Sequence, residues 1–310
     1  MPVDLIIPPP DLLQRIGPMG DEDPVGIYRE TGRLHRELLE TTLPADWSWT
    51  DKRVLDFGCG IGRMLQQFAP EAGEAEFWGC DLDRPSLDWL EANLSPPFHF
   101  FESTEVAGLP QEDGFFDLIY NFSVYTHFTD NWASWLLEHH RVLADGGLLF
   151  ATFLGEGMIE SLTGEQWDED RIGMNHLMHG YPWDLGGPIA FNSEWWLRAH
   201  WGRAFDIVEL HPRLGEGVPS HGIILARKKP MQISVEELTR LEPDEPREIL
   251  ALEHHIAQLA AEVERLHGAH GTQAAHSQRL EGELATMRDS TSWQLTAPLR
   301  SAKKLRQSRR

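Results

Sequence analysis

The chain of 310 residues has only two cysteines, no apolar run long enough to span a membrane, and no net positive charge. A membrane-spanning helix needs a run of about 18 apolar residues, so none is expected. The net charge of −22 argues against a general nucleic-acid binder, because such proteins displace counterions with clustered lysine and arginine. Cys59 and Cys80 lack metal-ligand spacing, and no signal peptide is visible. We therefore expect a cytoplasmic protein without a nucleic-acid partner.

A glycine-rich turn is the most informative stretch of the sequence. Residues 54–57 form an apolar strand that contains Asp56, and three glycines then occupy every second position, at Gly58, Gly60 and Gly62. Such a turn lets the backbone approach a ligand closely and directs free amides at it. A dinucleotide-binding fingerprint has two residues between its second and third glycines, whereas this turn has one. A helix should follow, with an apolar face made of Met64, Leu65 and Phe68.

A second acidic residue fits the same kind of site. Asp81 follows Gly62 by nineteen residues and closes a predicted strand. At the end of the second parallel strand, a carboxylate can accept hydrogen bonds from both hydroxyls of a ribose. This arrangement of glycines and acids resembles class I S-adenosylmethionine (SAM)-dependent methyltransferases. The phrases Phe-Asp-Leu-Ile-Tyr (116–120), Arg-Val-Leu (141–143) and Gly-Gly-Leu-Leu (146–149) extend the resemblance over about residues 25–230. The alternative is a phosphate-binding or purely structural turn.

The resemblance implies a fold, a cofactor and a set of binding residues. The fold is α/β, with a Rossmann-like sheet of seven strands that ends in an antiparallel hairpin at 205–210 and 222–226. The cofactor is SAM, and no metal is predicted. The residues assigned to the cofactor are Asp56, Gly58, Cys59, Gly60, Gly62, Asp81, Leu82 and Asn121.

The remaining elements of this domain follow from periodicity. Helices are predicted at 28–43, 85–94 and 132–143, and strands at 98–101, 117–122 and 148–153. The first helix should carry Leu34, Leu38 and Leu39 on one side. A helix before the first strand commonly covers the cofactor pocket in this family, so Tyr28 and Arg33 are candidate contacts of the methionine carboxylate, with surface roles as the alternative.

The acceptor should bind near the end of the fourth strand and the segment after the fifth. His127 follows that strand and is the first candidate for a catalytic base, and His179 is the next, together with His176. The spacing of His176 and His179 alone is too weak to predict a metal site. Residues 155–201 contain aromatic residues among acids, a combination that suits a sugar. Of these, Trp167, Tyr181 and Trp183 are pocket candidates, whereas Trp195, Trp196 and Trp201 are better explained by a helix packed on the sheet.

The chain divides into five segments: a lead-in at 1–24, the methyltransferase-like domain at 25–230, a linker at 231–247, a coiled coil at 248–289 and a basic amphipathic tail at 290–310. The heptad pattern in the coiled coil predicts a homo-oligomer, with a helix folded onto the domain as the alternative. Gly268 and Gly271 favour a break or hairpin within it. The heptad positions are Ile249, Leu252, Ile256, Leu259, Val263, Leu266, His270, Gln273, Ser277, Leu280, Leu284 and Met287.

The tail joins an aromatic and leucine-containing patch, around Trp293, to a basic run. Six positive charges and no acid follow from Arg300 onward, as expected of a peripheral contact with an inner-membrane surface. The run at 292–300 also resembles a motif at the ends of bacterial surface-polysaccharide glycosyltransferases and methyltransferases. The interpretation is an O-methyltransferase acting on a glycan or glycan precursor. The alternatives are a small-molecule or protein methyltransferase with an oligomerisation helix, and a SAM-binding scaffold without turnover.

Overall fold

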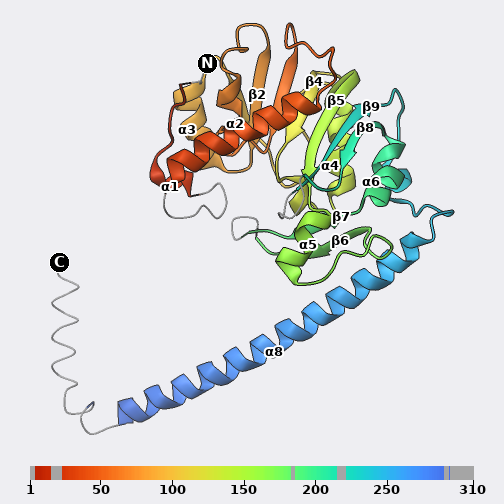
Figure 1. Ribbon diagram of the computed structural model, residues 1–310. Helices are drawn as coiled ribbons and strands as arrows, with labels where there is room; N and C mark the ends of the chain where they lie inside the picture. Colours follow the sequence, from red (N-terminus) through yellow and green to blue (C-terminus); the bar gives the residue numbers. More distant parts are fainter. Residues whose placement is uncertain (1–3, 15–22, 183–185, 215–220, 290–292, 294–310) are drawn as a thin grey trace, which may run out of the picture. The chain divides into compact units, whose positions relative to one another are not determined.

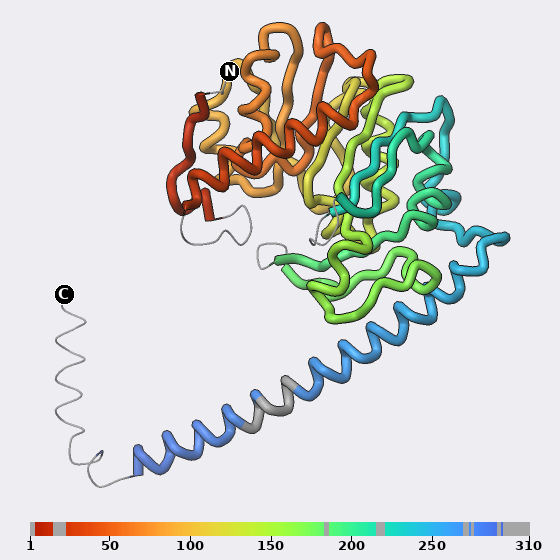
Figure 2. The backbone as a smooth tube through the Cα atoms, in the orientation of Figure 1, coloured from red at the N-terminus to blue at the C-terminus, as the bar shows by residue number. Residues whose placement is uncertain are grey.

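The structure is a computed structural model that describes residues 4–14, 23–182, 186–214, 221–289 and 293 (Figures 1 and 2). It consists of two compact units, residues 1–255 and residues 256–310. The predicted tail at 290–310, apart from Trp293, and the pocket candidate Trp183 lie outside the described residues.

A seven-stranded sheet forms the centre of the first unit, in the order β3-β2-β1-β4-β5-β9-β8. Strands β1 to β5 are parallel, whereas β9 is antiparallel to both β5 and β8, so the predicted Rossmann-like sheet with a final antiparallel hairpin is confirmed. The strands are β1 (Arg53–Phe57), β2 (Glu76–Asp81), β3 (His99–Glu102), β4 (Phe116–Asn121), β5 (Leu143–Phe153), β8 (Phe205–His211) and β9 (Gly222–Lys228).

Helices cover both faces of this sheet, because successive strand residues point to opposite faces and both sets are apolar. Val54 packs with α2 (Pro24–Thr42), α3 (Arg84–Leu94) and the short 3-10 helix η1 (Leu65–Phe68). Leu55 packs on the other face with α4 (Trp132–Val142), α6 (Glu194–His200) and α7 (Val235–Thr239). Asp23 and Asp83 cap the first turns of α2 and α3 by accepting from backbone amides.

One detail of the predicted helices is wrong. The stretch after the glycine turn forms only η1, because Pro70 has no amide hydrogen with which to continue a helix. In α2, Leu34 is exposed, and the buried face contains Tyr28, Gly32 and Leu39. Gly32 is required there because a Cβ atom would lie 2.3 Å from the carbonyl oxygen of Arg63.

A small separate lobe follows β5, in a stretch whose irregular spacing predicted no strands. It contains α5 (Glu156–Thr163) and a two-stranded antiparallel hairpin of β6 (Met174–Leu177) and β7 (Ile189–Asn192), which lie together in Figures 1 and 2. A cluster of its own holds the lobe together, made of Leu154, Ile159, Ile172 and Phe191. The tryptophans Trp195, Trp196 and Trp201 are buried in the main core, as the helix interpretation predicted.

The segments predicted as lead-in and linker both contribute to the first unit. Leu12 and Leu13, in and at the end of α1 (Pro10–Leu13), are buried against Tyr28 and Ile61. Helix α7 begins with a capping box of Ser234 and Glu237. The long helix α8 (Arg247–Asp289) begins in this unit, where the buried Glu248 carboxylate lies 2.9 Å from Nε2 of His200.

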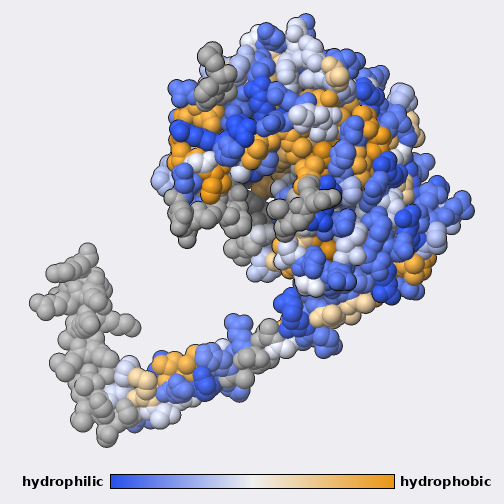
Figure 3. All heavy atoms as spheres, viewed as in Figure 1, coloured by the Kyte–Doolittle hydropathy of each residue, from blue (hydrophilic) through white to orange (hydrophobic). Residues whose placement is uncertain are grey.

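The second unit is described only as the continuation of α8. The helix runs without interruption through Gly268 and Gly271, so the predicted break is wrong. Apolar heptad residues are exposed along it, and Figure 3 shows hydrophobic residues at its surface beside hydrophilic ones. They include Ile256, Val263, Leu266, Leu280, Leu284 and Met287. No helix among the described residues is both long and apolar enough to cross a membrane.

Candidate cofactor and acceptor site

The glycine turn after β1 folds back on the end of β2. The amides of Gly58 and Cys59 both donate to the carbonyl oxygen of Cys80, each at 2.9 Å. The amide of Gly60 donates to the Asp81 carboxylate at 2.7 Å. Gly58, Gly60 and Gly62 all have positive φ, at 77°, 53° and 71°, a region that residues with a Cβ rarely adopt. The alternating glycines are therefore required by the turn itself.

The three glycines differ in what surrounds them. A Cβ atom would lie 2.5 Å from the Val124 side chain at Gly58, and 2.6 Å from the Leu90 side chain at Gly62. At Gly60 it would meet nothing within 4 Å. Gly58 and Gly62 thus pack against the protein, whereas Gly60 presents bare backbone to open space, as a closely approaching ligand requires.

Asp81 lies beside this open backbone. Its carboxylate accepts from the amide of Gly60 at 2.7 Å and from that of Asp83 at 2.9 Å, which fixes its orientation. Burial raises the pKa of Asp81, although these amides favour the ionised form. Each carboxylate oxygen has a further lone pair, so the group can still accept hydrogen bonds from a diol. Leu82 follows directly and is half-buried.

Asp56 lies behind the turn, in β1, and is buried. Burial, together with the nearby Asp81 carboxylate, raises the pKa of Asp56 to about 8, although the side chains of Tyr120 and Arg63 favour its ionised form. Burial in turn lowers the pKa of Arg63. The site therefore contains one carboxyl group whose charge is disfavoured and one, Asp81, that backbone amides hold in place.

Asn121 ends β4 at the same edge of the sheet. Its side chain is fully buried, and among the described residues neither its oxygen nor its nitrogen has a hydrogen-bond partner. Buried polar atoms in native proteins are almost always paired, so an amide of this kind indicates a polar ligand or water. The open face of Gly60, the carboxylate of Asp81 and the unpaired amide of Asn121 fit a nucleoside-type cofactor.

The residues after Asn121 form the loop that the sequence predicts to lie near the acceptor. Ser123 has a φ of 59°, and its amide donates to Oγ1 of Thr152 at 2.7 Å. Its hydroxyl lies 3.3 Å from Nε2 of His221, directly before β9. His127 ends the short 3-10 helix η2 (Tyr125–His127), and its ring is exposed. Nδ1 of His127 lies 2.7 Å from the carbonyl oxygen of Pro188, just before β7.

The part of the chain from β1 to the start of β5 matches a known family. Residues 54–147 match the model of the methyltransferase domain family. This segment is a methyltransferase domain. The family match and the geometry around Gly60 and Asp81 together identify its cofactor as S-adenosylmethionine.

Curated relatives match over part of their length. Phthiotriol/phenolphthiotriol dimycocerosates methyltransferase 1 of Mycobacterium ulcerans is 28% identical over 147 residues, which are 47% of this chain and 49% of that protein. An uncharacterised protein of Haemophilus influenzae is 30% identical over 127 residues, 38% of this chain and 48% of its own. The chain thus spans about half the length of the curated relatives it matches.

Solved structures were also found. A protein from Pyrococcus horikoshii has a TM-score of 0.48 and 17% identity, over 68% of this chain and 100% of its own. A SAM-dependent methyltransferase from Methanosarcina mazei has a TM-score of 0.44 and 19% identity, over 62% of this chain and 96% of its own.

Tyr28 and Arg33, the two candidate contacts of the methionine carboxylate, have partners within the protein, and for Arg33 these match the alternative surface role. The hydroxyl of Tyr28 donates to the carbonyl oxygen of Ile61 at 3.1 Å, so it supports the turn from within the protein. Arg33 is exposed and pairs with Glu30 and Glu37 at 2.7 and 2.8 Å. Neither side chain is free to bind a carboxylate.

Two residues of this site were missed from the sequence. Arg63 directly follows the last glycine, and its position in the motif was the available signal. His221 directly precedes the antiparallel strand β9, and the pairing of Gly222 with Phe153 brings it to the carboxyl end of β5. That placement depends on topology, so no local pattern indicated it.

The tryptophan, tyrosine and histidine candidates of the lobe differ in their contacts and exposure. Nε1 of Trp167 donates to Glu169 at 2.8 Å, and Tyr181 is 47% exposed. Nε2 of His179 lies 2.9 Å from Oδ2 of Asp130, so this histidine pairs with a carboxylate.

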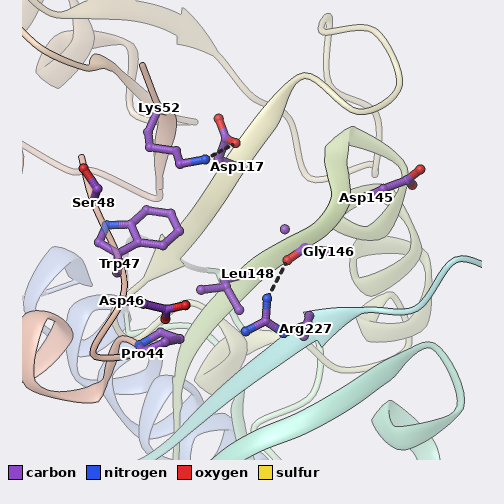
Figure 4. Close-up of a pocket in the computed structure, with 11 residues that line it drawn as sticks. Pro44, Asp46, Trp47, Ser48, Lys52, Asp117, Asp145, Gly146, Leu148 and Arg227 are labelled. Carbon is purple, nitrogen blue, oxygen red and sulfur yellow. Dashed lines mark hydrogen bonds and ion pairs between the residues drawn. The ribbon is translucent and has the colours of Figure 1, made fainter. Parts of the chain in front are cut away.

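A hollow lies at the opposite edge of the sheet from the cofactor turn and is shown in Figure 4. Lys52 and Asp117 form an ion pair there at 3.0 Å, and Arg227 donates to the carbonyl oxygen of Gly146 at 3.1 Å. This edge carries the amino ends of the parallel strands, whereas doubly wound sheets bind ligands at the carboxyl ends. The hollow is therefore separate from the cofactor site of the methyltransferase domain.

Proposed function

We propose that the protein transfers a methyl group from SAM to a hydroxyl group of a glycan or glycan precursor. The observation that best supports methyl transfer is the glycine turn of the methyltransferase domain, where the backbone of Gly60 is open beside the Asp81 carboxylate. Bound SAM supplies a methyl group that its sulfonium already activates. The protein must then align the acceptor and remove its proton.

His127 is the general base in this proposal. A carbonyl oxygen has no hydrogen to donate, so the contact with Pro188 requires the proton to be on Nδ1 of His127. In the neutral ring, Nε2 then carries the lone pair and can accept a proton from an acceptor hydroxyl. The residue is exposed and lies six positions after the last residue of β4, beyond the strand end where ligands of such sheets bind.

The glycan acceptor is supported by the lobe after β5 and by the resemblance of the tail. Trp167 and Tyr181 occur there with Glu169 and Asp168, and aromatic faces next to carboxylates suit the C–H faces and hydroxyls of a sugar. A lipid acceptor is the second candidate, because the relative from Mycobacterium ulcerans is named for phthiotriol dimycocerosates.

Assembly and location complete the proposal. The exposed apolar heptad residues of α8, such as Ile256 and Val263, support a homo-oligomeric coiled coil. The basic composition from Arg300 onward supports peripheral contact with an anionic inner-membrane surface.

The test has two stages. Calorimetric titration of the full-length protein with SAM and with its demethylated product measures cofactor binding. Transfer of a labelled methyl group to glycans, glycolipids and lipid alcohols then measures the acceptor class. Binding with transfer to glycans supports the proposal, transfer to lipids alone replaces the acceptor, and binding without any transfer favours a scaffold.

A substitution separates catalysis from binding. We expect His127→Gln to lower the transfer rate by about 10²- to 10⁴-fold, the usual contribution of a general base, with unchanged SAM affinity. The matched control is His211→Gln, because His211 is also exposed but pairs with Glu209 on β8. Equal rates in the two variants would remove His127 from the mechanism.

A further inference from the structure

Three metal-ligating side chains meet where the hairpin lobe faces the loop after β4. Asp130 precedes α4, His176 is in β6, and His179 is in the turn that follows β6. One ligand atom from each residue lies within 4.8 Å of those of the other two. Within the described ranges, this is the sole group of three His, Cys, Asp or Glu residues that meets this distance.

We propose that Asp130, His176 and His179 bind a divalent transition-metal ion, with zinc as the best chemical match. Two imidazoles and one carboxylate are a donor set that zinc accepts, whereas magnesium and calcium prefer oxygen ligands alone. The site is independent of the methyl-transfer proposal, because it stands on side chains that do not belong to the cofactor turn.

The distances fit such an ion after a small adjustment. Zinc bonds nitrogen and oxygen ligands at about 2.0–2.2 Å, so two ligand atoms of a tetrahedral site lie about 3.4 Å apart. Oδ2 of Asp130 and Nε2 of His179 are 2.9 Å apart, so these two atoms would move slightly apart on metal binding. All ligand atoms lie within 4.8 Å of one another, so the pair farthest apart would approach by at most about 1.4 Å. The side chains of Asp130 and His179 are 79% and 48% exposed, so they are free to make this adjustment.

The third proposed ligand, His176, has its backbone contacted by a residue of helix α8. Nε2 of His255, in α8, lies 3.1 Å from the carbonyl oxygen and 3.3 Å from the amide nitrogen of His176. The rings of His176 and His255 are nearly perpendicular, with their centroids 4.3 Å apart. The turn after β6 places the remaining histidine, through positive φ values at Met178 and Gly180. The contacts of His255 fix the backbone position from which the ring of His176 extends.

The ion would join two segments that are distant in the sequence. Asp130 belongs to the loop that also carries His127, and both histidines belong to the hairpin lobe. Three protein ligands leave a coordination position for water or for an oxygen of another molecule, as in zinc sites that bind small ligands. The site therefore fastens the lobe to the acceptor side of the domain.

Metal binding is measured on the untagged full-length protein after dialysis against a chelator. We expect calorimetry to show one zinc ion per chain, and cobalt to give the visible absorption of a low-coordinate nitrogen and oxygen site. Asp130→Asn with His179→Gln should abolish both signals. His255→Phe should weaken zinc binding without abolishing it, because it removes a contact that holds the backbone of His176.

The control is again His211→Gln, which removes an exposed histidine paired with a carboxylate where no third ligand is found among the described residues. It should leave the affinity and the stoichiometry unchanged. Thermal unfolding in chelator shows that each variant is folded. No binding by the wild-type protein, or binding that survives the double substitution, would overturn the proposal and leave an ordinary histidine–aspartate ion pair.

Discussion

The three glycines of the cofactor turn allow a test in which fold and ligand binding separate. Gly60 and Gly62 share a positive φ, so alanine at either position costs about 1–2 kcal/mol in the folded state. At Gly62 the new methyl group also overlaps the side chain of Leu90, which is fully buried, and overpacking adds about 1–3 kcal/mol. At Gly60 it enters open space.

The expected results follow from these magnitudes. For a domain of this size, 1 kcal/mol shifts the midpoint of thermal unfolding by about 2–4 °C, so Gly60→Ala should lower it by about 2–8 °C and Gly62→Ala by about 4–20 °C. Binding should show the reverse order. Gly60→Ala places a methyl group where the cofactor approaches, and we expect the SAM affinity to fall by at least about tenfold, equivalent to 1.4 kcal/mol.

Calorimetric titration with SAM and differential scanning calorimetry on the same preparations measure both quantities. Gly62→Ala is compared at a temperature where it is folded, and it should bind SAM with nearly wild-type affinity. The reasoning is refuted if Gly60→Ala binds SAM as tightly as the wild-type protein, because the open face of the turn would then not be the cofactor side.

Three further predictions test other parts of the structure. Asp81→Ala should abolish SAM binding while circular dichroism shows an intact fold, and normal binding would reject the ribose assignment. Asp56 has a pKa of about 8 in the folded chain and the ordinary value of 3.8 in the unfolded chain, so this group lowers the free energy of unfolding increasingly as pH rises from about 4 to 8. The free energy of unfolding of Asp56→Asn should therefore depend less on pH in that window than that of the wild-type protein. Denaturant titrations at several pH values measure this dependence, and the same dependence in both proteins would contradict the prediction. Truncation after His255 should give a monomer by light scattering that still binds SAM, whereas an unchanged oligomer would show that α8 does not assemble the chain.

The sheet and the cofactor turn were predictable because their signals are local. Short continuous apolar runs mark the strands, because both faces of the parallel sheet are buried, and the positive φ of Gly58, Gly60 and Gly62 imposes the glycine spacing that is visible in the sequence. Asp81 was found because strand length places the end of β2 beside that turn. Backbone rules of this kind act within a few residues, so they can be read without the fold.

Other features depend on contacts between distant segments. The side chain of Gln66, in η1, accepts from the amide and donates to the carbonyl oxygen of Ile6, 60 residues earlier in the chain, and no local pattern indicated this contact. The hairpin β6–β7 is short, and no alternating pattern marks it. The approach of Asp130 to His179, 49 residues later, is likewise a result of tertiary packing.

These two kinds of determinant divide the site into halves. The cofactor half is built mainly from backbone amides and glycines, whereas the acceptor half, as proposed above, is built from side chains on the loop after β4, on the hairpin lobe and directly before β9. Within the acceptor half, the hydrogen bond from His127 to the carbonyl oxygen of Pro188 joins the loop after β4 to the hairpin lobe. Substitutions in the lobe can therefore change the acceptor without changing the turn that binds the cofactor. The family match covers residues 54–147 and ends before the lobe. Under the proposed function, the lobe is therefore the place where substitutions should alter the choice of acceptor.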